Sequence, residues 1–194
     1  MKEEIEVKRK IYTVVEQIGE HSYKVERKGQ FFFLKKYEND ADKFEAFCNA
    51  EHRLRVSGVV NPKCFVYDKK ERIAVVDYIE GETCLDILMQ GSLPEEILEQ
   101  LFKTFWYAKN DGIALDYHPD NFKFVNDKLF YIPFKVSKFI SNDFFIQQDL
   151  RLWFFTKEFI NYSRSIGKDP DTKLLKSDYE INKSMALMTV KYYK

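Results

Sequence analysis

The octapeptide LDYHPDNF, residues 115–122, decides how the fold of this chain is interpreted. It places Asp116 five positions before Asn121, with His118 and Pro119 between them. Because Asp, Pro and Asn all favour turns, the stretch predicts a loop. Taken alone, it is equally compatible with a capped turn that has no chemical role. The segments on either side therefore have to decide between the two interpretations.

Segments before the loop predict a strand-rich half. Residues 11–37 contain three apolar runs separated by glycine-containing breaks, which is typical of a meander of short strands. A helix over 43–56 follows, because its apolar residues recur at roughly helical spacing. Strands over 63–67 and 73–78 complete a β-β-β-α-β-β order.

Helices predominate in the second half, which begins after Glu80-Gly81. The expected elements there are a short helix, a long helix, the loop, a strand hairpin and two more helices, over residues 85–89, 94–110, 113–119, 122–125 with 129–134, 149–162 and 178–192. A strand-rich half followed by a helix-rich half predicts an α+β fold. We set the two halves at 1–80 and 81–194 and expect a cleft between them, the usual place for a small-molecule site.

The composition excludes several classes of protein. Lys plus Arg and Asp plus Glu number 31 each among 194 residues, so no net field attracts the chain to nucleic acid. The N-terminal sequence lacks the apolar run of an ordinary secretory signal, and no stretch approaches transmembrane length. We therefore expect a soluble cytoplasmic protein with no transmembrane segment and no nucleic-acid partner.

The octapeptide resembles the catalytic loop of protein kinases, in which an aspartate and an asparagine stand at the same interval in the pattern HRDxxxxN. The His-Pro pair at 118 and 119 is closer to the loop of aminoglycoside phosphotransferases and small lipopolysaccharide-core kinases. The resemblance implies the two-lobed protein-kinase-like fold, with a β-rich N-lobe carrying one main helix and a mostly helical C-lobe. It also implies that Asp116 orients an acceptor hydroxyl and that Asn121 holds Mg²⁺ beside ATP.

A second part of the resemblance is a lysine at the end of a strand. Residues 32–35, FFLK, resemble the VAIK element of kinases, which implies that Lys35 contacts the nucleotide phosphates. Lys36 is the rival, because side chains alternate across a strand. The glutamate expected to pair with the lysine is Glu51 on the following helix, with Glu45 as the alternative.

Further nucleotide-binding positions follow from the same resemblance. Gly19 and Ser22 lie where kinases have a glycine-rich loop, although this chain keeps a single glycine there. Asp77, Tyr78 and Ile79 resemble the linker between kinase lobes, whose backbone binds adenine.

Two residues are expected to support the catalytic loop without taking part in chemistry. Asp149 is similar to the aspartate that braces the loop from below in kinases, and His118 is a structural member of the loop itself.

The pattern fails at the principal metal-binding carboxylate. The expected aspartate follows the hairpin after Asn121, and counting along the chain puts Pro133 in its place. Proline offers no side-chain oxygen, whereas Mg²⁺ requires oxygen ligands. Asp120 or Asp127 is the available substitute carboxylate.

Three hypotheses follow. The first is an active kinase, an ATP-dependent transferase that phosphorylates a small-molecule, sugar or lipid-sugar acceptor. The second is a pseudokinase that binds nucleotide and acts as a scaffold or regulator of a protein partner, because Pro133 cannot bind metal. The third is an unrelated α+β binding domain whose motif matches are fortuitous.

Overall fold

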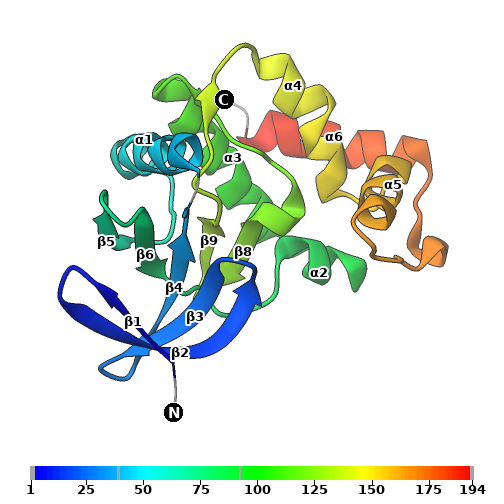
Figure 1. Cartoon of the computed structure of the whole chain (residues 1–194). Coiled ribbons are helices and arrows are strands. Elements are labelled where there is room, and N and C mark those ends of the chain that lie inside the picture. Colours follow the sequence, from blue (N-terminus) through cyan, green and yellow to red (C-terminus); the bar gives the residue numbers. More distant parts are fainter. Residues whose placement is uncertain (1–2, 39, 92, 193–194) are drawn as a thin grey trace. The chain divides into compact units, whose positions relative to one another are not determined.

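The computed structural model describes residues 3–38, 40–91 and 93–192. The expected α+β class is confirmed: an antiparallel sheet precedes a mainly helical part (Figure 1). The chain divides into two compact units. The N-terminal unit comprises the residues up to His52 together with Asn61–Glu80, and the C-terminal unit comprises Arg53–Val60 and the residues from Gly81 onward.

The N-terminal unit is built on a six-stranded antiparallel sheet with the strand order β1-β2-β3-β4-β6-β5. Its elements, in chain order, are β1 (Glu4–Val7), β2 (Lys10–Gly19), β3 (Ser22–Arg27), β4 (Gln30–Lys36), α1 (Ala41–Ser57), β5 (Cys64–Asp68) and β6 (Ile73–Asp77). The predicted meander, helix and strand pair are therefore all present. Strand β1 was not predicted, and it extends the sheet by pairing with β2.

Strand β4 separates the two faces of this sheet. Phe32 and Leu34 are buried in the apolar core of the unit. Lys35 projects from the opposite face, because side chains alternate along a strand. It lies directly opposite Ser22 on one neighbouring strand and Ala74 on the other. The hydrophobic pattern of β4 thus fixes which of its lysines shares a face with Ser22.

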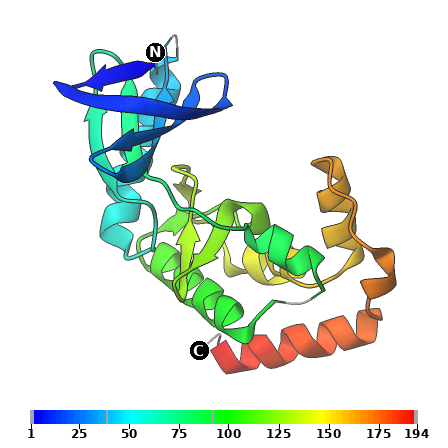
Figure 2. The ribbon, with the colours of Figure 1, turned by 90° about the horizontal axis from the view of Figure 1, so that it is seen from below.

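The C-terminal unit is mainly helical. Its elements are α2 (Cys84–Met89), α3 (Glu95–Asn110), β7 (Ile113–Ala114), the 3-10 turn η1 (Pro119–Asn121), β8 (Phe122–Val125), β9 (Lys128–Tyr131), β10 (Ser137–Lys138), α4 (Asn142–Gln147), the 3-10 helix η2 (Asp149–Trp153), α5 (Lys157–Ser165), the 3-10 turn η3 (Thr172–Leu174) and α6 (Asp178–Tyr192). The hairpin β8–β9 packs against α3, and the C-terminal end of α6 contacts α3 (Figures 1 and 2).

The single helix predicted over 149–162 is wrong. The chain instead forms η2, an extended break and then α5, whose first amide groups are capped by the Thr156 hydroxyl. The break allows aromatic side chains to enter two different apolar clusters. Trp153 packs in the main core of the unit, whereas Phe155 and Phe159 pack in a second cluster. One continuous helix could not direct this aromatic run to both.

Two further boundaries differ from the prediction. The strand expected to reach Phe134 ends at Tyr131, because Pro133 has no N–H with which to continue a ladder. The segment expected to be a loop over 113–119 begins with β7, which pairs with β10. Helix α4 was not predicted.

Across the described ranges, no helix is both long enough and apolar enough to cross a bilayer. The cytoplasmic location expected from the sequence stays a prediction.

Candidate functional site

Hydrogen bonds within the loop of the C-terminal unit bring Asp116 and Asn121 together. The Asn121 side-chain amide donates to the Asp116 carbonyl at 3.1 Å, and the Asn121 N–H donates to the His118 carbonyl at 2.9 Å. The Asp116 N–H donates to the Tyr131 hydroxyl at 3.3 Å. Pro119 begins the η1 turn, where its fixed φ is compatible with the backbone. The loop is therefore tied both to itself and to β9.

The Asp116 carboxylate has two nitrogen neighbours. One oxygen, Oδ1, lies 3.0 Å from His118 Nδ1, and the other, Oδ2, lies 3.7 Å from Lys135 Nζ. The Asp116 side chain is 30% exposed, so a solvent-borne hydroxyl can reach it. This partial exposure distinguishes Asp116 from a buried carboxylate whose oxygens only cap a turn.

His118 is held by a neighbouring tyrosine. Its ring lies 4.4 Å, centroid to centroid, from the ring of Tyr162 on α5. The Tyr162 hydroxyl donates to Asp120 Oδ1 at 2.6 Å. Burial and this bond to Asp120 raise the pKa of Tyr162, so the hydroxyl stays protonated as a donor at neutral pH. The contacts are compatible with the structural role expected for His118.

Helix η2 contributes one hydrogen bond to the loop and one carboxyl group that interacts with it electrostatically. Burial is the main cause that raises the pKa of Asp149 to about 6; His118 acts against it, and the Asp116 charge adds a smaller upward contribution. Asp149 therefore lies within electrostatic range of the loop. The hydrogen bond from η2 to the loop comes from another residue: Trp153 Nε1 donates to the buried Tyr117 carbonyl at 2.7 Å.

The described residues do not fit the Mg²⁺ site that the kinase resemblance implies. Pro133 offers no side-chain ligand, and Asp120 already accepts from Tyr162. Asp127 lies at the β8–β9 turn, whereas Asn121 precedes the opposite end of that hairpin, which puts the two roughly 13 Å apart at 3.3 Å per residue. Asp127 is therefore too distant to be the substitute carboxylate. The Asn121 Oδ1 remains as a single neutral candidate ligand.

In the N-terminal unit, three of the expected phosphate-binding residues lie at one end of the sheet. Lys35 is paired with Ser22 across the β3–β4 ladder, and Ser22 is paired with Gly19 at the β2–β3 turn. Lys36 extends from the other face, where its Nζ lies 5.4 Å from the ring centroid of Tyr23. The two lysines thus have different surroundings, and Lys35 is the one grouped with Ser22.

Lys35 and Glu51, the expected ion pair, each have a different neighbour, and their pairing stays a prediction. Lys35 Nζ lies 5.3 Å from the ring centroid of Tyr37. Glu51 lines a recess against β5 that includes Cys64. Burial, followed by the Glu51 charge, raises the pKa of the Cys64 thiol to about 12. Glu45, the alternative, is exposed on α1.

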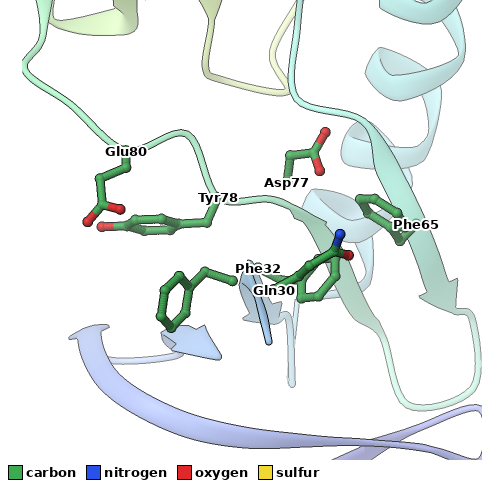
Figure 3. Close-up of a pocket in the computed structure, with 7 residues that line it drawn as sticks. Gln30, Phe32, Phe65, Asp77, Tyr78 and Glu80 are labelled. Carbon is green, nitrogen blue, oxygen red and sulfur yellow. The ribbon is translucent and has the colours of Figure 1, made fainter. Parts of the chain in front are cut away.

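Asp77 and Tyr78, two of the three residues expected to bind adenine, line a pocket of the N-terminal unit with a volume of about 290 Å³. Figure 3 shows Tyr78 and Glu80 on one side of the view and Phe65 on the other. Asp77 is opposite Phe32 in the β4–β6 ladder, three residues from Lys35, so the pocket begins roughly 10 Å from the Lys35 end of the sheet. The remaining lining residues are Gln30, Phe31 and Phe32.

A lysine that sequence reasoning missed lies beside this pocket. Lys24 Nζ is 4.4 Å from the ring centroid of Tyr78, 4.6 Å from that of Phe31, and 3.2 Å from Glu80 Oε1. Lys24 therefore contacts both Tyr78 and Glu80, the residues that precede and follow Ile79 in the sequence. The linker segment is therefore fixed to β3 by a cation.

Comparisons with known proteins do not identify the chain. No protein-family model matches it, and no curated protein matches it. Within the described ranges, no three His, Cys, Asp or Glu side chains converge as a metal-binding group.

The residues missed from the sequence are those that tie the candidate site together, namely Lys24, Tyr131, Lys135, Trp153 and Tyr162. A partial signal existed for the aromatic residues, because a buried tyrosine or tryptophan needs a hydrogen-bond partner. Their partners are 15 to 42 residues away along the chain, so the sequence offered no spacing to reveal them.

Proposed function

We propose that this chain is an ATP-dependent phosphotransferase with the two-lobed protein-kinase-like fold. The observation that carries the proposal is the loop after α3, in which Asn121 is bonded to the Asp116 backbone while the Asp116 carboxylate stays accessible. Lys35, near the end of β4 and before helix α1, supports the same superfamily.

In the proposed reaction, the acceptor hydroxyl approaches Asp116. Its oxygen forms a bond to the γ-phosphorus of ATP while the bond from that phosphorus to the β,γ-bridging oxygen breaks, and ADP leaves. The hydroxyl proton passes to the Asp116 carboxylate. Lys35 contacts the phosphates, and the backbone of residues 77–79 binds the adenine. The acceptor is a small-molecule, sugar or lipid-sugar hydroxyl, a class taken from the resemblance of His118-Pro119.

Pro133 favours a second candidate function, a nucleotide-binding pseudokinase. Positioning and charge neutralisation supply most of the catalysis in phosphoryl transfer, so loss of the metal carboxylate weakens the case for turnover. In this role the chain would bind nucleotide and regulate a protein partner.

Binding and turnover separate these two functions. Thermal unfolding is measured with ATP, with Mg²⁺ and with both, for the wild type, Lys35→Ala and Lys36→Ala. A ligand at a hundred times its Kd adds about 2.7 kcal/mol of stability, a clearly visible shift. We expect Lys35→Ala to abolish the shift and Lys36→Ala, which alters the opposite face of β4, to preserve it.

ADP production from ATP, with water as the acceptor, then tests turnover in the wild type and in Asp116→Asn. Turnover that Asp116→Asn reduces at least tenfold supports the phosphotransferase. Nucleotide binding without turnover supports the pseudokinase. No thermal shift under any condition contradicts both and leaves the unrelated binding domain.

A further inference from the structure

Lys135 places a positive charge beside the candidate catalytic aspartate. Its Nζ lies 3.7 Å from Asp116 Oδ2. Its side chain is 78% exposed, so the ammonium can also meet an anion that arrives from solvent.

The backbone of Lys135 is fixed to the loop. The Tyr131 hydroxyl donates to the Lys135 carbonyl at 2.8 Å and accepts from the Asp116 N–H at 3.3 Å, and the Tyr131 side chain is fully buried. The Ile132 N–H donates to the Asn121 carbonyl at 2.9 Å. The segment after β9 is therefore held against the loop at two points. The Lys135 side chain can change rotamer, whereas these hydrogen bonds fix the position of its backbone beside the loop.

The surroundings need such a cation if a phosphate is to approach. Asp116, Asp120 and Asp149 all belong to the loop or to the helix beneath it, and like charges at short range repel an incoming anion. In kinases a metal ion held by an aspartate neutralises this charge. In this chain Pro133 occupies the position expected for that aspartate, and Lys135 lies two residues after it.

We propose that Lys135 takes the electrostatic place of the metal ion. Its ammonium bridges the Asp116 carboxylate and a phosphate oxygen, so the site binds a nucleoside triphosphate in its metal-free form. An ammonium is a compact charge with three donors, which suits contact with both anions at once. The inference rests on the proposed nucleotide binding. It adds that the bound nucleotide carries no metal ion and that Lys135 is the residue that favours this metal-free form.

The test is the Kd of ATP measured by calorimetry in EDTA and in excess Mg²⁺. The proteins are the wild type, Lys135→Ala, Lys135→Arg and Lys138→Ala. Lys138 is a matched control, because it is an exposed lysine three residues further along the chain. We expect the wild type to bind ATP in EDTA at least as tightly as in Mg²⁺. Lys135→Ala weakens metal-free binding at least tenfold, whereas Lys135→Arg and Lys138→Ala stay within threefold of the wild type.

A fifth protein, Pro133→Asp, restores the missing carboxylate. We expect it to bind ATP more tightly in Mg²⁺ than in EDTA, the reverse of the wild type. Circular dichroism of each variant checks that it is folded. A wild type that binds ATP only with Mg²⁺, or a Lys135→Ala variant that binds metal-free ATP normally, overturns the role of Lys135 and leaves nucleotide binding intact. Absence of ATP binding in both media overturns the proposed function and this inference together.

Discussion

Replacing Tyr131 by phenylalanine removes one oxygen atom from the centre of the candidate site. That oxygen donates to the Lys135 carbonyl and accepts from the Asp116 N–H. Burial raises the pKa of the Tyr131 hydroxyl, so in the native protein it remains a donor throughout the neutral range. The substitution keeps the ring and its packing, and it leaves two backbone groups without their partner.

The expected loss of stability follows from the two backbone groups left unpaired, the Lys135 carbonyl and the Asp116 N–H. A hydrogen bond contributes about 1 kcal/mol net, and a buried group left unsatisfied costs roughly 1–3 kcal/mol. The 3.3 Å bond to the Asp116 N–H is the weaker of the two, so we expect a total loss of about 1–3 kcal/mol. For a chain of 194 residues, this corresponds to a fall in Tm of roughly 3–9 °C.

The assay is urea unfolding followed by tryptophan fluorescence, with Tyr107→Phe as the matched control. Tyr107 is 48% exposed on α3, so losing its hydroxyl should change stability by less than about 0.5 kcal/mol. A Tyr131→Phe loss no larger than that of the control would refute the reasoning, because the hydroxyl would then not be holding the two backbone segments together.

Three more outcomes can be measured by urea unfolding. Asp149→Asn should stabilise the protein at pH 7 and not below pH 4. The native pKa of Asp149, about 6, lies above the unfolded value of 3.8, so the ionised carboxylate destabilises the folded state increasingly as pH rises from 3.8 to 6. The expected gain at pH 7 is roughly 1–2 kcal/mol after discounting for solvent screening. A gain that does not change with pH would contradict this. Gly81→Ala should cost about 1–3 kcal/mol, because φ is +125° and the new Cβ would lie 3.2 Å from Val125 Cγ2; an unchanged midpoint would argue against strain there. Trp153→Phe should cost about 1–3 kcal/mol by leaving the Tyr117 carbonyl unpaired, and full stability would show that water replaces the indole.

Local sequence was sufficient for most of the element order. The turns predicted at Lys28-Gly29 and at Asn126-Asp127 are present between β3 and β4 and between β8 and β9, and all four residues have positive φ. The helix over 149–162 failed because its apolar residues are divided between two clusters. That division depends on which cores are available, and no periodicity within the segment reveals it.

The candidate site was predictable in part. The interval between Asp116 and Asn121 was visible in the sequence, and so was the proline in place of a carboxylate. The ion pair to Lys135 was not visible, nor was the position of Asp127 at the far end of its hairpin. Both depend on how the hairpin returns to the loop, which is decided by contacts between residues distant in sequence.

By itself, the sequence determined the α+β class, the turn positions and the residue types available for chemistry, because these depend on backbone preferences and local periodicity. Only the tertiary structure decided that Lys35 and Lys36 have different neighbours, that Lys24 holds the linker, and that Tyr131 joins Asp116 to Lys135. The physical reason is that hydrogen bonds and ion pairs act over a few ångströms of space, whatever the separation of the residues along the chain.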